Sequence, residues 1–205
     1  MVEAASVERQ TQVERTEKMR ARLLKATLEV VVEEGWGKAS TQKICARAGV
    51  SRGAQTHHFP TKTDLLLAAI SEILRAHQRE LDKPVKNRAS DEQKLEKLFS
   101  LLWDACLDNL FMESWMEAMT AARTDTNLKA AIAPMDKRGI QSIRNLTQQF
   151  DEEYSEHRKL AADLIELTIY LLRGMVIQRG AHDSEKQHKR LFNLWKQLIK
   201  TKLDS

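Results

Sequence analysis

The 205-residue sequence lacks the features that disulfide-bonded, metal-binding or membrane-spanning proteins require. It has only two cysteines, Cys45 and Cys106, and neither lies in a CxxC or Cys/His spacing, so we expect reduced thiols. No apolar run approaches about 18 residues, and no apolar signal segment opens the chain. These absences predict a cytoplasmic protein that does not contact a membrane.

Glycine and proline are scarce as well, with seven and three residues respectively. Residues with high helix propensity, above all Leu, Ala, Glu, Lys and Gln, are abundant along the whole chain. The composition therefore predicts an all-α protein, and the length is sufficient for a substantial core in one or two domains.

Recognisable catalytic machinery is also missing. Neither cysteine has a nearby histidine that could generate a thiolate, and the sequence contains no Gly-rich phosphate loop and no nucleophile elbow. His57 and His58 are adjacent, so on a helix they point about 100° apart and cannot chelate a metal as an i, i+4 pair would. We therefore expect no enzyme, no cofactor and no metal site.

The net charge of +4 at pH 7 is unevenly distributed. Between Arg15 and Lys62 there are ten basic residues and four acidic ones, so this segment carries +6 and the rest of the chain sums to about −2. Such a local excess is typical of a surface that binds nucleic-acid phosphates, although a solvated basic face would give the same pattern.

The segment from Ser40 to Lys62 predicts two short helices joined by a tight turn. Ser40 can cap the first helix, in which apolar and small residues recur at helical spacing. Gly49 can end this helix in the left-handed conformation, and Ser51 can cap a second helix that runs from Arg52 to His58. This is the pattern of a helix-turn-helix.

The second of these helices has few residues that could build a core and several that could contact DNA. Arg52 and Gln55 can read base edges in a major groove, while Thr56, His57 and His58 suit phosphates. With neighbouring polar residues included, we predict a DNA-binding surface of Ser40, Thr41, Lys43, Ser51, Arg52, Gly53, Gln55, Thr56, His57, His58 and Lys62.

The joint spacing of these residues resembles the DNA-binding domain of the TetR family of bacterial transcription regulators. The resemblance spans about residues 16 to 70 and rests on the runs Ile44-Cys45-x-x-Ala48-Gly49-Val50-Ser51-x-Gly53 and His58-Phe59-x-x-Lys62-x-x-Leu65-Leu66. Two positions depart from many members, since Cys45 stands where alanine is common and Thr56 where tyrosine is common.

The resemblance implies a ligand-responsive repressor that binds a palindromic operator in double-stranded DNA as a homodimer. A small organic effector bound in a helical C-terminal domain would then release the operator. The alternative is a helical adaptor that binds only protein, which explains the helices but neither the local charge excess nor the groove-compatible residues Arg52, Gln55 and Thr56.

Capping signals and breaks in the apolar pattern divide the chain into four parts. We predict a mobile N-terminal arm at 1–14, a three-helix domain with the helix-turn-helix at 15–62, and a connecting helix at 63–82. A break at 83–87 then precedes a helical ligand-binding and dimerisation domain at 88–205.

The helix predicted from Glu156 to about Arg179 has apolar residues on more than one side, so it must be covered twice. One side can pack on its own domain, which leaves the other side and the last helix, Ser184 to Leu203, free to pair with a second copy. We therefore predict a four-helix dimer interface that includes Leu172, Val176, Leu191, Leu194, Trp195 and Leu198.

Aromatic residues and methionines at helical spacing in the C-terminal domain are candidate walls of the effector pocket, although such stripes are also common in plain cores. Arg144 and Arg173 could meet an anionic ligand or pair with Glu113 or Glu117. The predicted pocket residues are Trp103, Cys106, Phe111, Trp115, Met116, Met119, Ile140, Ile143 and Tyr170.

Overall fold

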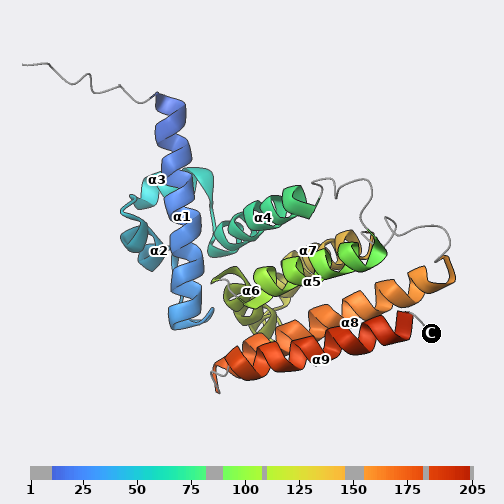
Figure 1. The fold of residues 1–205 in the computed structure, drawn as a ribbon. Coiled ribbons are helices and arrows are strands. Elements are labelled where there is room, and N and C mark those ends of the chain that lie inside the picture. Colours follow the sequence, from blue (N-terminus) through green and yellow to red (C-terminus); the bar gives the residue numbers. More distant parts are fainter. Residues whose placement is uncertain (1–10, 82–89, 108–109, 146–154, 182–184, 204–205) are drawn as a thin grey trace, which may run out of the picture. The chain divides into compact units, whose positions relative to one another are not determined.

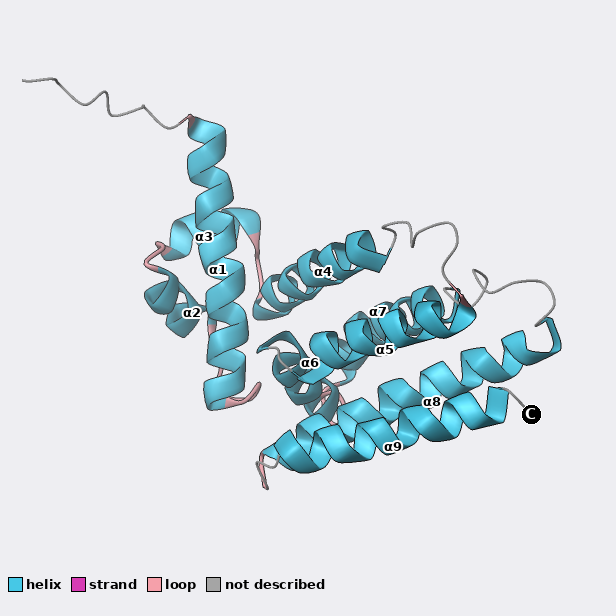
Figure 2. Cartoon of the chain, in the orientation of Figure 1, coloured by secondary structure: helices cyan, strands magenta, loops and turns pink. Residues whose placement is uncertain are grey.

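The computed structural model describes residues 11–81, 90–107, 110–145, 155–181 and 185–203. Within these ranges the chain forms nine α-helices, which confirms the predicted all-α fold (Figures 1 and 2). The chain divides into two compact units, Met1–Ala69 and Ile70–Ser205, and each is described by itself. None of the helices in the described ranges is long and apolar enough to cross a membrane.

The first unit contains three complete helices and the start of a fourth. Their bounds are α1 (Gln12–Glu34), α2 (Thr41–Ala48), α3 (Arg52–His58) and α4 (Lys62–Leu81), of which α4 continues across the division. The core between them contains Leu23, Leu24, Val31, Ile44, Phe59, Leu65 and Leu66, all at most 5% exposed. Full burial of each such side chain contributes roughly 1.5 to 3 kcal/mol, so α1 and the start of α4 hold the two short helices in place.

Helix α1 begins earlier than the sequence predicts, so part of the expected N-terminal arm at 1–14 is helical. The Oγ1 of Thr11 accepts a hydrogen bond from the Glu14 amide at 3.2 Å, and the Glu14 carboxylate accepts one from the Thr11 amide at 2.9 Å. This capping box satisfies two amides that the end of a helix leaves without partners. Residues 1–10 lie outside the described ranges.

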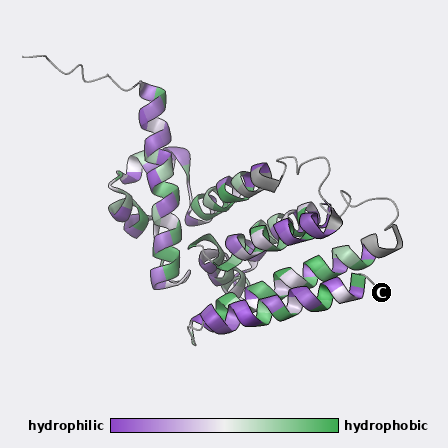
Figure 3. Ribbon diagram, viewed as in Figure 1, coloured by the Kyte–Doolittle hydropathy of each residue, from purple (hydrophilic) through white to green (hydrophobic). Residues whose placement is uncertain are grey.

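The second unit contains the rest of α4 and five further helices. They are α5 (Asp91–Leu107), α6 (Leu110–Ala121), α7 (Thr126–Asn145), α8 (Ser155–Arg179) and α9 (Glu185–Leu203). The predicted boundary at 83–87 lies outside the described residues, and the division between the two units falls inside α4. Helices α8 and α9 lie side by side, each with green apolar segments between purple polar ones in Figure 3.

Candidate functional site

The helix-turn-helix is built from three local features that the sequence predicts, namely a serine cap at the start of each helix and a glycine at the end of α2. The Oγ of Ser40 accepts a hydrogen bond from the Lys43 amide at 3.3 Å, and the Oγ of Ser51 accepts one from the Ala54 amide at 3.3 Å. Gly49 closes α2 in the left-handed conformation, with φ of 62° and ψ of 42°. Because glycine has no Cβ, this turn is unstrained and α3 starts in a fixed direction.

Helix α3 turns one side to solvent, and four residues of the predicted DNA-binding surface lie on it. Arg52, Gly53, Thr56 and His57 are exposed, whereas His58 is half-buried. The Oγ1 of Thr56 donates a hydrogen bond to the Arg52 carbonyl at 2.9 Å, which holds the hydroxyl against its own helix. The guanidinium of Arg52 has no carboxylate partner in the described part of the chain, so it is available to a base or a phosphate.

Gln55 is not on this side, and its assignment as an outward base-reading residue is wrong. Only 1% of its surface is exposed. Its Nε2 donates to the Phe59 carbonyl, and its Oε1 lies 3.8 Å from the Cys45 Sγ. Three residues after Arg52 the helix has turned toward α2, so the amide satisfies a carbonyl at the end of α3 instead of pointing at DNA.

Gly53 stands in the exposed side of α3 although the fold does not require a glycine there. Its backbone is helical without a positive φ, and a Cβ atom at this position would have no other part of the described chain within 4 Å. Glycine inside a helix costs roughly 0.5 to 1 kcal/mol relative to alanine. The missing side chain therefore leaves open space on the side of α3 that faces outward.

Two lysines of the predicted DNA-binding surface are already engaged within the first unit. The Nζ of Lys62 donates to the carbonyls of Trp36 and Ala39 at 2.6 and 3.0 Å, and it lies 4.0 Å from the centre of the Trp36 ring. The Nζ of Lys43 contacts the Glu34 carboxylate and donates to the Lys38 carbonyl at 3.2 Å. Lys62 thus ties the start of α4 to the loop before α2, which is a structural role that the sequence did not reveal.

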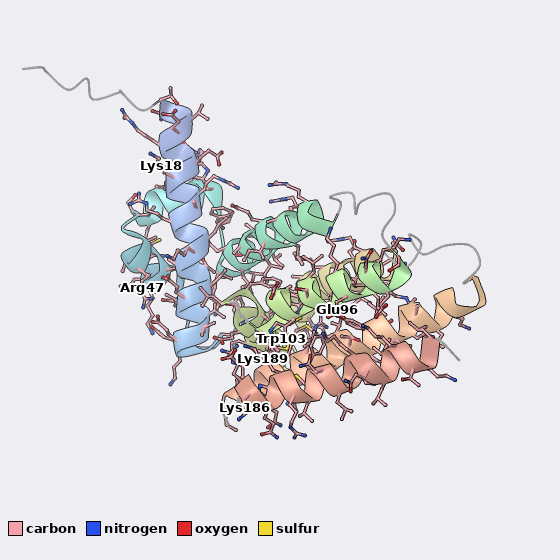
Figure 4. All side chains as sticks on the ribbon, in the orientation of Figure 1. Lys18, Arg47, Glu96, Trp103, Lys186 and Lys189 are labelled. Carbon is pink, nitrogen blue, oxygen red and sulfur yellow. The ribbon has the colours of Figure 1, made fainter. Side chains whose placement is uncertain are left out.

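A row of cations along α1 is a feature that the sequence analysis did not single out. Arg15, Lys18 and Arg22 are exposed, and none has a carboxylate partner among the described residues. Their spacing of three and four places them on one side of the helix, and Lys18 extends from it in Figure 4. The Nη1 of Arg22 lies 3.8 Å from where a Cβ of Gly49 would be, so the row reaches the turn before α3.

The acidic residues further along α1 are neutralised by α2. Arg47 holds the Glu33 carboxylate through two hydrogen bonds, of 2.8 and 2.5 Å, and its Nη1 lies 3.5 Å from the Glu29 carboxylate. The hydrogen bonds from Arg47 lower the pKa of Glu33, so this carboxyl stays ionised and paired. Glu29 and Glu33 are therefore matched by Arg47, which reduces their repulsion of phosphates at this surface.

Four of the nine predicted effector-pocket residues belong to the core of the second unit. Cys106, Phe111, Trp115 and Met116 are buried, and burial raises the pKa of the Cys106 thiol to about 12, which leaves it protonated and unreactive. The remaining residues differ in their surroundings: the Trp103 ring lies 4.9 Å from that of Phe192, Ile143 is half-buried, and Tyr170 is 49% exposed.

An open groove of about 660 Å³ lies between α6, α7 and α8. Two of the predicted pocket residues, Met119 and Ile140, line it. The other lining residues are both apolar and charged, and they are Ala122, Arg123, Lys129, Ile132, Ala133, Asp136, Lys137, Gln141, Arg144 and Glu166.

The two arginines expected to meet a ligand or a glutamate of α6 pair with other acids. Arg144 contacts Glu166 and donates to the Asp163 carboxylate at 3.0 Å. Arg173 donates to the Asp136 carboxylate at 2.7 Å, and its buried Nε has no hydrogen-bond partner within the described ranges. Both arginines link α7 to α8 through these acids.

The predicted dimer interface needs a similar correction. Leu172 and Val176 are only 0% and 6% exposed within one chain, so they cannot meet a second copy. The half-buried Trp195 donates its indole N–H to the Thr168 Oγ1 at 2.9 Å. On α9, Leu191 is half-buried, and Leu194 and Leu198 are about half exposed. A different side of α8 also exposes apolar side chains, namely Leu167, Tyr170 and Ile177.

Comparison with known proteins assigns the helix-turn-helix to a family. Residues 23–69 match the family described as "Bacterial regulatory proteins, tetR family". An HTH-type transcriptional regulator of Mycobacterium tuberculosis (strain H37Rv) is 36% identical over 60% of this chain and 62% of its own length. The HTH-type transcriptional regulator BetI of Escherichia coli O157:H7 is 30% identical over 68% of this chain and 71% of its own length.

The fold as a whole has counterparts among solved structures. The transcriptional regulator FadR from Bacillus subtilis, solved in complex with stearoyl-CoA, superposes with a TM-score of 0.67 over 87% of this chain and 96% of that chain. The sequences are 18% identical over this superposition, so the likeness is one of fold.

Proposed function

Because this chain belongs to the TetR family of bacterial transcription regulators, a family of DNA-binding proteins and not of enzymes, we propose that it is a ligand-responsive repressor. In this proposal a homodimer binds a palindromic operator through α3, and a small organic effector bound in the second unit releases the DNA. The observation that carries the DNA half is the outward side of α3, where Arg52, Gly53, Thr56 and His57 are exposed together.

Dimerisation is part of the proposal because one short helix contacts too few bases to select a site in a genome. Two such helices related by a twofold axis read two half-sites, which makes the operator an inverted repeat. The apolar rows on α8 and α9 support this assembly: Leu167, Tyr170, Ile177, Leu194 and Leu198 are all 49 to 60% exposed. Apolar side chains at a spacing of three and seven on α8 and of four on α9 are typical of helices that pair with other helices.

Release by an effector rests on two observations. The second unit contains a groove of about 660 Å³, which is large enough for a small organic molecule. FadR, which shares the fold, is described in complex with stearoyl-CoA, so one protein of this architecture holds a small molecule. Coupling requires that the effector and the operator favour different arrangements of the dimer, and then each weakens the other by the same factor.

Selection of sites from random double-stranded DNA tests the DNA half directly. We expect an inverted repeat with half-sites one helical turn or more apart, because the dimer presents two copies of α3. Arg52→Ala is expected to relax the preference at one position of each half-site, since a guanidinium at a base edge contributes about 1 to 3 kcal/mol of discrimination. If the selection recovered no inverted repeat, this result would argue against binding of DNA by a dimer.

A further inference from the structure

The groove between α6, α7 and α8 combines an apolar floor with cations that have no carboxylate partner in the described part of the chain. Met119, Ala122, Ile132, Ala133 and Ile140 supply the apolar part from α6, the turn after it and α7. Ile132 is buried and Met119 and Ile140 are half-buried, so this floor is continuous with the core of the unit. Such a surface can hold a hydrocarbon chain or ring.

The lining residues of α7 recur at intervals of three and four along one side of the helix. They extend from Lys129 to Arg144, which corresponds to about 22 Å along the helix axis. The groove is therefore elongated, and its shape favours a linear ligand that lies along α7.

The charges in the groove are not balanced. Its two acids are both engaged, Asp136 by Arg173 at 2.7 Å and Glu166 by Arg144 and by the Tyr170 hydroxyl at 2.8 Å. Three exposed cations, Arg123, Lys129 and Lys137, have no carboxylate partner in the described ranges. An anionic group bound there would compensate their charge.

Two of these three cations lie at one end of the groove, and the third, Lys137, lies on α7 between Ala133 and Ile140. Arg123 follows the end of α6 and Lys129 lies in the first turns of α7, so both are at the α6–α7 corner. The opposite end is formed by Arg144, whose charge is already matched by Glu166 and Asp163. A ligand with one charged end would therefore place that end at the corner and its chain along Ile132, Ala133 and Ile140.

We propose that this groove binds a linear amphipathic anion, with its anionic head between Arg123 and Lys129 and its hydrocarbon chain along α7. The inference rests on the proposed function in that it names the chemical class of the effector, but binding at the groove can be measured without DNA. A neutral or cationic amphiphile of the same length lacks the attraction to the corner and binds more weakly.

Three probes that share one chain length test the class of ligand, namely decanoate, decanol and decyltrimethylammonium, below the concentrations at which they form micelles. Isothermal titration calorimetry of the full chain is expected to show one decanoate per chain, bound roughly tenfold or more tightly than the other two. Equal affinity for all three probes would overturn the assignment of an anion.

Matched variants test the place of binding. Arg123→Gln with Lys129→Gln should reduce the affinity for decanoate to that for decanol, whereas Arg138→Gln with Lys186→Gln removes two exposed cations outside the groove and should have no effect. Ala133→Phe should fill the path of the chain and abolish binding of all probes. Ala130→Phe, on the neighbouring exposed position outside the groove, should leave it unchanged.

Two results would overturn the proposed site: decanoate binding that survives Ala133→Phe, or binding that is insensitive to loss of Arg123 and Lys129. Circular dichroism of each variant shows whether the fold is intact, so a loss of binding in a folded variant supports the site. Decanoate that binds as expected but leaves the selected operator bound would support the groove as an anion site and would reject the effector half of the proposed function.

Discussion

Replacing Gly53 with alanine should raise the stability of the protein and at the same time weaken its binding to DNA. The added Cβ has no other part of the described chain within 4 Å, and the backbone of Gly53 is helical, so the methyl group fits the free protein without strain. Alanine also restricts the unfolded chain more than glycine does. The affinity for DNA falls if the duplex approaches α3 most closely at this open space, because the added methyl group would then meet the DNA.

The expected changes in stability and in DNA affinity can be given magnitudes. A gain of about 0.5 to 1 kcal/mol in the free energy of unfolding corresponds to an increase in melting temperature of roughly 1 to 4 °C for a chain of this length. A loss of about 1.4 kcal/mol or more in DNA binding corresponds to a tenfold or greater increase in Kd. Calorimetric melting measures the first change, and fluorescence anisotropy with a selected operator measures the second.

Gly139→Ala is the matched control, because Gly139 lies in α7 and also has open space around its Cα. It should raise the melting temperature by a similar amount without changing the affinity for DNA. A Gly53→Ala protein that binds the operator as tightly as the parent would refute the idea that DNA occupies this space. A protein that melts at a lower temperature would show that the space is not open in the free molecule.

Gln55→Met should lower the free energy of unfolding by about 1 to 2 kcal/mol in urea denaturation, because the variant keeps the volume but removes the hydrogen bond to the Phe59 carbonyl. Lys62→Met should cost about 1 to 3 kcal/mol in the same assay, since two carbonyls lose a charged donor. Lys18→Gln should reduce the slope of log Kd against log salt concentration by about one without changing the selected operator. Leu198→Glu should give helical monomers in analytical ultracentrifugation, with weak DNA binding, because a charge would enter the proposed dimer interface.

Each of these predictions has an outcome that contradicts it. Gln55→Met with unchanged stability and an altered operator would restore Gln55 as a base-reading residue. Unchanged stability of Lys62→Met would make its ammonium free for phosphate. If Lys18→Gln kept the parent's slope of log Kd against log salt concentration, the row of cations on α1 would not be part of the DNA interface. If the Leu198→Glu protein stayed dimeric, the interface would have to lie elsewhere.

The helix-turn-helix could be predicted because its signals are local. A serine before each helix and a glycine after the first determine where these helices begin and end, and the structure has Ser40, Gly49 and Ser51 in those roles. The Thr61–Asp64 and Ser90–Gln93 pairs cap α4 and α5 for the same reason. Such hydrogen bonds join residues three apart, so neighbouring sequence suffices to predict them.

The sequence could not show which polar residues of the predicted site face outward. Gln55, Arg52 and Thr56 share one short helix, and only the packing of α3 against α2 directs Gln55 inward while the other two stay exposed. Lysine is a residue type that commonly contacts phosphate, but the Nζ of Lys62 donates hydrogen bonds to two loop carbonyls that are 26 and 23 residues away in the chain. Contacts over such distances leave no periodic trace in the sequence.

The second unit shows the same contrast between features that the sequence predicts and features that depend on tertiary packing. Composition and periodicity determine that α8 is apolar on more than one side, but they do not determine which side its own neighbours cover. Tertiary packing buries Leu172 and Val176 and leaves Leu167 and Ile177 in solvent. It also pairs Arg144 and Arg173 with Asp163, Glu166 and Asp136, and it leaves Arg123 and Lys129 without a carboxylate partner among the residues that the structure describes. Neighbouring residues determine which segments form helices. The exposure and the charge of a surface depend instead on which helices pack against each other.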